Sequence, residues 1–151
     1  MPGHEWDQML AEAAGEVLET MFFAGIYGPA EPAADDAEPR LAARLHFEGR
    51  PSGALTLSIS EAAARALAAN FLADEEPEPL PAAQLGSVVG ELTNMICGTL
   101  LSRVRTEERF RLSTPESLPA DWIRPPEAPS QSLDLGEGTI DLWVTVEEHA
   151  G

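Results

Sequence analysis

The sequence contains no lysine, a single cysteine and no long hydrophobic run. A P-loop needs its lysine, so nucleotide binding through that motif is excluded. The lone Cys97 rules out an internal disulfide bond and is predicted to be a buried, unreactive thiol. No apolar stretch reaches the roughly 18 residues of a membrane span, and the N-terminus lacks the basic and apolar regions of a signal peptide. These absences predict a cytoplasmic protein without membrane insertion.

Positive charge is also scarce, because nine arginines face 26 acidic residues and the formal net charge is −17. Nucleic-acid phosphates require clustered Lys or Arg, so nucleic acid is not an expected partner. The three histidines, His4, His46 and His149, have no ligand-like spacing. Without a second cysteine they predict no metal site in this chain. The sequence contains no Gly-x-Ser-x-Gly elbow, so this motif does not indicate a serine hydrolase.

The composition is nevertheless that of a folded protein. Hydrophobic residues make up 44% of the 151 residues and charged residues 23%, which is typical of one globular domain with a real core. We therefore expect residues 1–151 to form a single domain. Two acidic, proline-rich stretches, at about 28–39 and 74–81, are predicted to be loops.

Hydrophobic periodicity predicts the order of the secondary structure. Spacings of three and four predict helices over 5–24, 61–72 and 82–104, the second with Ser60 as its N-cap. Alternation predicts strands over 41–48, 54–60, 109–113, 130–135 and 139–147, of which the first two form a hairpin. This mixed order indicates an α+β fold with a largely antiparallel sheet. A short match of Gly15–Glu19 with Gly90–Asn94 suggests two related halves, each a helix followed by strands.

The helix predicted over 82–104 has two contrasting sides. Steps of about 100° per residue place an apolar set on one side, predicted to face the core: Leu85, Val88, Val89, Leu92, Met95, Ile96, Thr99 and Leu100. The opposite side carries small and polar residues: Ser87, Gly90, Glu91, Asn94 and Gly98. Glu91 and Asn94 are three residues apart, so they are neighbours on one face.

This second side is unusual for a solvent-facing helix, which normally carries strong helix formers. Glycine costs a helix about 0.5–1 kcal/mol relative to alanine, and asparagine is also a poor mid-helix residue. A face with so little bulk allows another surface to approach, so we infer that it presents Glu91 and Asn94 to a docked partner. A structural alternative stays open. Gly90 and Gly98 would permit helix packing within the domain or a dimer, and Asn94 would bond to a local backbone group.

The run Glu91-Leu92-Thr93-Asn94-Met95-Ile96, followed by Gly98, resembles the signature helix of CheX-type chemotaxis phosphatases of the CheC/CheX/FliY family. The end of the first helix, Glu19–Phe22, and the segment Leu112–Pro115 are also similar to that family. The order of elements fits over nearly the whole chain. The resemblance implies a CheC-like fold with two pseudo-symmetric halves.

The resemblance also implies an activity, the hydrolysis of the aspartyl phosphate of a phosphorylated CheY-type response regulator. Glu91 would dock on a lysine of the regulator, and Asn94 would orient the attacking water. The regulator would hold the Mg²⁺, so no cofactor is expected in this chain. Phosphoryl transfer depends mostly on positioning and charge stabilisation, which explains why no His, Cys or metal cluster is needed here.

Two positions depart from the family pattern. Glu19 stands where a second site, in the first half, would need an asparagine, so one site is expected. Thr99 follows Gly98 where the family often has asparagine. The alternative function is a non-catalytic CheX-like binding or dimerisation module in a two-component or flagellar-switch complex, and a homodimer is compatible with both functions.

Overall fold

The computed structural model describes residues 2–22, 24–30, 39–49, 52–72, 82–104, 109–119, 122, 125 and 129–147. Its elements, in chain order, are α1 (Pro2–Met21), β1 (Gly28–Pro29), β2 (Arg40–Glu48), β3 (Ser52–Ser60), α2 (Glu61–Leu72), α3 (Ala82–Val104), β4 (Arg111–Leu112), β5 (Glu116–Leu118), β6 (Gln131–Asp134) and β7 (Thr139–Glu147). The predicted bounds of α2 and α3 are confirmed, whereas α1 ends at Met21, three residues earlier than predicted.

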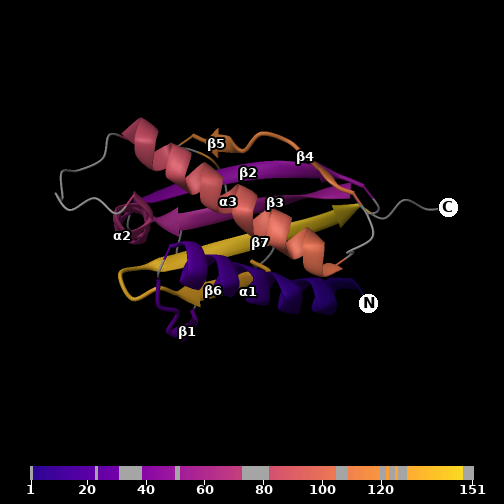
Figure 1. The fold of residues 1–151 in the computed structure, drawn as a ribbon, viewed down its shortest axis with the longest axis horizontal. Helices are drawn as coiled ribbons and strands as arrows, with labels where there is room; N and C mark the ends of the chain where they lie inside the picture. The colour runs from indigo at the N-terminus through magenta and orange to yellow at the C-terminus, as the bar shows by residue number, and fades with distance from the viewer. Residues whose placement is uncertain are drawn as a thin grey trace.

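The strands form one seven-stranded sheet in the order β1-β6-β7-β3-β2-β4, with β5 also pairing with β2. Every pairing is antiparallel, so the predicted α+β class with an antiparallel sheet is confirmed. Helices α1 and α3 lie side by side across one face of the sheet (Figure 1). Among the helices in the described part of the chain, none combines the length and apolar character that a membrane crossing requires.

The predicted hairpin is present between β2 and β3, with Leu45 opposite Leu55. Alternate residues of both strands point into the core beneath the helices, as the period-2 pattern requires. At the end of β3, the Ser60 hydroxyl oxygen accepts a hydrogen bond from the backbone N–H of Ala63 at 3.4 Å. Ser60 is therefore the N-cap of α2, as predicted.

Three short edge strands correct the sequence prediction. The predicted loop over 28–39 begins with β1, and the predicted strand over 109–113 is reduced to β4. Strand β5 follows it and was not predicted. Strands of two or three residues are too short to show a hydrophobic period. They form only because they pair with a neighbouring strand. The predicted loop residues 31–38 and 74–81 lie outside the described residues.

The topology relates the two halves of the chain. Strands β3 and β7 pair at the centre of the sheet, and hairpin partners β2 and β6 flank them. Each half contributes an edge strand to the other half, since β1 pairs with β6 and β5 pairs with β2. The match of Gly15 with Gly90 agrees with this relation. A Cβ at Gly15 would contact Ile26, just before β1, and a Cβ at Gly90 would contact Pro115, just before β5.

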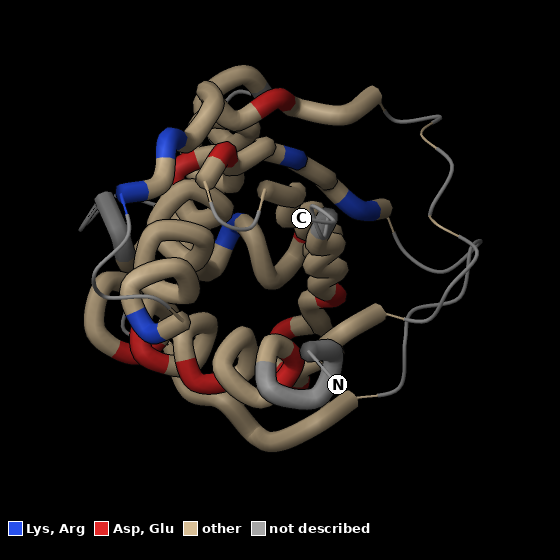
Figure 2. Tube along the Cα trace, turned by 90° about the vertical axis from the view of Figure 1, so that its right-hand side faces the viewer, with Lys and Arg blue, Asp and Glu red and all other residues tan. Residues whose placement is uncertain are grey.

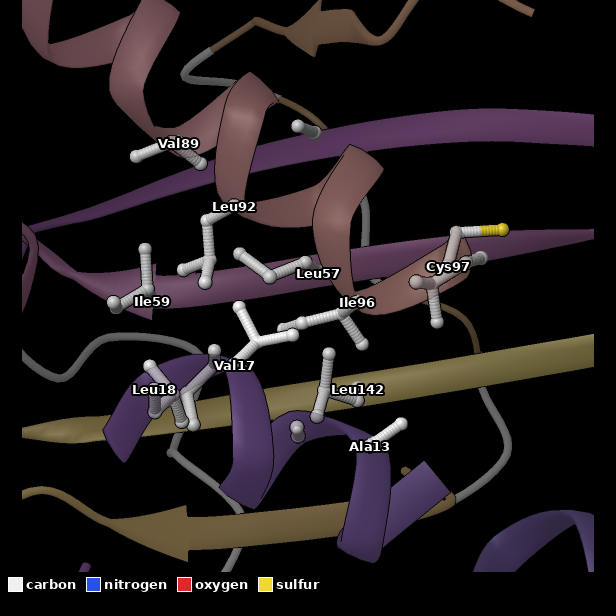
Figure 3. Packing of buried hydrophobic residues seen from close by; sticks show 14 of the residues in the cluster. Ala13, Val17, Leu18, Leu57, Ile59, Val89, Leu92, Ile96, Cys97 and Leu142 are labelled. Carbon is white, nitrogen blue, oxygen red and sulfur yellow. The ribbon is translucent and has the colours of Figure 1, made fainter. Parts of the chain in front are cut away.

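The core lies between the two long helices and the sheet. Figure 3 shows Val17 of α1, Ile96 of α3 and Leu142 of β7 among the side chains that meet there. Burying each such aliphatic side chain contributes roughly 1.5–3 kcal/mol. This packing fixes α3 against both α1 and the sheet, and so fixes which side of α3 faces outward.

A buried polar network occupies the opposite face of the sheet. Arg40 of β2 donates from Nε to Ser58 Oγ of β3 at 2.8 Å and from Nη1 to Thr139 Oγ1 of β7 at 3.2 Å. Its Nη2 lies 3.6 Å from Oδ2 of Asp141, which is fully buried. Ser132 of β6 donates to Oδ1 of Asp141 at 2.7 Å. The network thus ties four neighbouring strands together.

Cys97 is fully buried on α3, as predicted, and burial raises the pKa of its thiol to about 12. At pH 8 the thiol is therefore protonated and shielded from reagents. We expect a thiol-specific chromogenic disulfide to react at least about 100-fold more slowly with the native protein than with the urea-unfolded protein. Equal rates would show that the α3 packing described here is wrong.

Candidate functional site

Helix α3 buries the side that its sequence predicts. Six of the predicted core residues are buried: Leu85, Val88, Val89, Leu92, Ile96 and Leu100. Met95 packs against the core while partly exposed, and Thr99, predicted to be in the core, is only half-buried. The buried side is wider than the predicted core set, since it also includes Thr93 and Leu101, together with Cys97, which was predicted to be buried. The packing of α3 between α1 and β2 causes this widening, which helical periodicity alone does not reveal.

The remaining side of α3 forms a continuous accessible stripe, defined by Ser87, Gly90, Glu91, Asn94 and Gly98. Ser87 and Glu91 are exposed, and the other three are half-buried. Glu91 and Asn94 lie one turn apart on this stripe, as predicted. The structure therefore brings all five predicted site residues to one surface.

Glu91 and Asn94 have no intramolecular partner among the described residues, because neither side chain makes a hydrogen bond or an ion pair there. Ser87 differs, since its hydroxyl donates to the carbonyl oxygen of Ala83 at 3.1 Å. The structural alternative for Asn94, a bond to a local backbone group, finds no support in these contacts. Both polar groups remain available to a partner.

The two glycines of the stripe differ in what lies beside them. A Cβ at Gly98 would meet nothing within 4 Å. A Cβ at Gly90 would lie 3.4 Å from Cβ of Pro115, and one at Gly86 would lie 3.5 Å from Oγ of Ser117. The segment leading into β5 therefore flanks the stripe on one side. The segment Leu112–Pro115 was identified from the sequence as similar to the family, but no sequence pattern predicts that it lies against α3.

Replacing Gly98 by alanine is expected to stabilise the isolated protein by about 0.5–1 kcal/mol, because the new methyl group meets no atom and alanine favours the helix. Urea unfolding at equilibrium measures the difference. Gly90→Ala is the matched comparison and should gain at least as much, since its methyl group would make an ordinary van der Waals contact with Cβ of Pro115 at 3.4 Å. A loss of stability in Gly98→Ala would mean that another surface already packs on this position.

The corresponding position in the first half is occupied differently. Glu16, which aligns with Glu91, accepts a hydrogen bond from Nη2 of Arg103 at 2.9 Å. Arg103 also lies 3.5 Å from Glu12, so it joins the end of α3 to α1. The Glu16 carboxylate is thus engaged within the chain, and an exposed Glu19 stands at the position of Asn94.

Metal ligands are not grouped in this part of the structure. Within the described ranges, no cluster of three or more His, Cys, Asp or Glu side chains is arranged to hold a metal ion. The chemistry of the stripe is therefore that of one carboxylate and one amide on a helix with little side-chain bulk.

Solved structures with the same architecture come from chemotaxis proteins. The chemotaxis protein CheX from Vibrio vulnificus has a TM-score of 0.74 and 20% sequence identity, over 95% of this chain and 97% of that chain. A CheC-like superfamily protein from Shewanella has a TM-score of 0.68 and 19% identity, over 94% and 97%. The CheX–CheY–BeF₃–Mg²⁺ complex from Borrelia burgdorferi gives 0.68 and 15%, over 93% and 97%. The fold is therefore CheC-like.

The family is shown by the sequence itself. The family described as "Chemotaxis phosphatase CheX" matches residues 41–122, which is more than half of the 151 residues and includes Glu91 and Asn94. The chain belongs to this CheX family, as its α3 motif predicted. A comparison with curated proteins finds no match.

Proposed function

We propose that this protein hydrolyses the aspartyl phosphate of a phosphorylated CheY-type response regulator. The observation that carries the proposal is the pair Glu91 and Asn94, accessible and without intramolecular partners one turn apart on α3, in a chain of the CheX family. A structural neighbour, the Borrelia burgdorferi complex, joins a CheX to a CheY with BeF₃ and Mg²⁺. That complex supports the choice of a CheY-type partner.

In this proposal Glu91 fixes the docked complex by pairing with a lysine of the regulator. The chain has no lysine of its own, so no lysine of this chain competes with the regulator's lysine for the Glu91 carboxylate. A complementary charge pair at an interface sets register and association rate as well as affinity. The missing bulk at Gly98, where a Cβ would meet nothing within 4 Å, lets the regulator backbone come close to α3.

Asn94 would enter the regulator's active site and aim a water molecule at phosphorus. Its amide oxygen accepts a hydrogen bond from the water, and its amide nitrogen donates one to the water or to a phosphoryl oxygen. The amide carries no charge, so it does not repel the phosphoryl group. The Mg²⁺ would be held by the regulator, and this chain would contribute positioning alone.

Only one site is proposed. The first half offers Glu16 bound to Arg103 and, in place of the amide, the carboxylate of Glu19. A carboxylate at that position would repel a phosphoryl group and, unlike an amide, offers no N–H donor. The proposal therefore assigns the activity to α3.

Docking on the α3 stripe is tested by binding. The probe is a CheY-type regulator loaded with Mg²⁺ and BeF₃⁻, a stable phosphoryl mimic. Glu91→Gln is expected to weaken binding about 10-fold or more through loss of the charge pair. Glu19→Gln is the matched control on α1 and should bind like the wild type. Equal weakening by both variants would contradict a single docking site.

A second copy of this chain is the competing occupant of the stripe. Gly98→Arg adds bulk and charge where a Cβ meets no atom of the chain, so it should block docking without disturbing the fold. Light scattering on wild type and Gly98→Arg separates the two occupants. An oligomer that dissociates in the variant would assign the stripe to a dimer.

A further inference from the structure

A pocket lies on the face of the sheet opposite to α1 and α3. Arg44 and His46 of β2 line it, and they alternate with Leu45 and Phe47, which face the helices. The pocket has a volume of about 320 Å³ and is lined by Arg44, His46, Gly53, Ala54, Thr56, Pro125, Trp143 and Thr145. We call this site the sheet pocket. It lies on the other side of the sheet from Glu91 and Asn94.

The strand register builds the pocket from two rows of side chains. Arg44, Thr56 and Trp143 are directly opposite one another on β2, β3 and β7, and His46, Ala54 and Thr145 form the next row. Residues two apart on a strand lie about 7 Å from each other. The two nitrogen-rich side chains therefore flank one cavity of small-ligand size.

A small residue forms the floor of the pocket. Ala54 separates His46 from Thr145 in the strand register. Trp143 also lines the pocket but is only 3% exposed, so it supports the floor from beneath. Its ring is held edge-on by Trp122 with centroids 6.1 Å apart. The floor is therefore fixed, which favours a preformed site.

The polar side chains that line the pocket can all donate hydrogen bonds. Arg44 donates from Nε to Thr56 Oγ1 at 3.1 Å, which orients the guanidinium. Its terminal nitrogens and the His46 imidazole make no hydrogen bond or ion pair with any described residue. Glu116 stands opposite Arg44 on β5, yet the two form no ion pair. Among the residues that the structure describes, none of those lining the pocket carries a carboxylate.

This lining contrasts with the chain as a whole, in which 26 acidic residues outnumber nine arginines. In Figure 2 the arginines of the described residues lie at several separate places along the trace. Among the described lining residues the Arg44 guanidinium is the one permanent charge, and in a concave site it focuses positive potential there. The guanidinium fork matches a carboxylate or phosphate in a bidentate manner.

We propose that the sheet pocket binds a small organic anion, with its carboxylate or phosphate on Arg44 and His46 and its apolar body over the half-buried Ala54 and Pro125. A volume of about 320 Å³ is at the lower end for ligand sites and accommodates a molecule of the size of benzoate or phenyl phosphate. The proposal does not depend on phosphatase activity, so each can fail without the other.

The test is ¹H–¹⁵N NMR titration, which resolves the indole N–H of Trp143 and the backbone amides of β2 and β3. The probes are benzoate and phenyl phosphate, with benzyl alcohol as the uncharged match. Both anions are expected to shift these signals saturably with a Kd of about 0.1–1 mM. The anion that binds more tightly identifies the head group. The proposal would be overturned if neither anion saturates these shifts at about 10 mM, or if benzyl alcohol binds as tightly as the anions.

Two variants test the residues. Arg44→Gln is expected to weaken anion binding about 10-fold or more, whereas Arg65→Gln, an exposed arginine paired with Glu61 on α2, should bind like the wild type. Ala54→Val fills the floor and keeps both donors, so it should abolish binding of benzoate while the amide spectrum stays folded. Unchanged affinity in both Arg44→Gln and Ala54→Val would contradict the assignment. If Arg44→Gln fails to fold, the Ala54→Val result decides.

Discussion

Replacing Asn94 by alanine is expected to lower the rate at which the protein dephosphorylates a CheY-type regulator by about 100-fold or more. The amide is proposed to position the water, and no other group on the α3 stripe both donates and accepts at that place. Binding of the BeF₃⁻-loaded regulator should change little, since Glu91 remains. The measurement is single-turnover loss of phosphate under saturating conditions, which separates rate from binding.

The chain supplies a matched control for this substitution. Its only other asparagine, Asn70, is exposed on α2, and Asn70→Ala should hydrolyse at the wild-type rate. A drop of similar size in both variants would indicate a general loss of structure. An unchanged rate in Asn94→Ala would remove the amide from the mechanism.

Replacing Asp141 by asparagine is expected to destabilise the fold by about 3 kcal/mol, because it removes the negative charge of the buried Arg40–Asp141 pair. The Asp141 side chain is fully buried, and that of Arg40 is 12% exposed. The carboxylate is also an acceptor for Ser132, so the change affects β2, β6 and β7 together. The unfolding free energy from urea titration measures the loss.

Two further variants test the reason for this loss. Glu12→Gln removes an exposed partner of Arg103 and should cost less than about 0.5 kcal/mol. The double variant Arg40→Met with Asp141→Leu removes both charges and should recover much of the stability lost in Asp141→Asn. If the double variant is less stable than the single one, hydrogen bonding by Arg40 matters more than charge balance.

Most of the fold was predictable because its long elements carry regular patterns. The 23 residues of α3 repeat their apolar positions often enough to define both bounds and faces. The β2–β3 hairpin alternates cleanly in the same way. Strands β1, β4 and β5 have two or three residues each. Such strands depend on distant partners, so local sequence does not define them.

The same distinction applies to the sites. Glu91 and Asn94 were predictable because one helix holds both, at a spacing that fixes their geometry. The position of Pro115 beside Gly90 was not predictable, because it depends on how β5 pairs with β2. The Arg40–Asp141 pair and the sheet pocket likewise depend on strand register across 80 or more residues of sequence. The alternation within β2 predicts only that Arg44 and His46 lie on the same side of the strand.

The central claim is that the α3 stripe catalyses loss of phosphate from a response regulator. The most direct measurement follows the decay of a phosphorylated CheY-type regulator with substoichiometric wild-type protein. The proposed function predicts complete decay that is faster than the regulator's own, with each molecule of this protein acting on many regulators. Decay at the regulator's own rate, in the presence of a demonstrated complex, would contradict catalysis and leave a non-catalytic binding module.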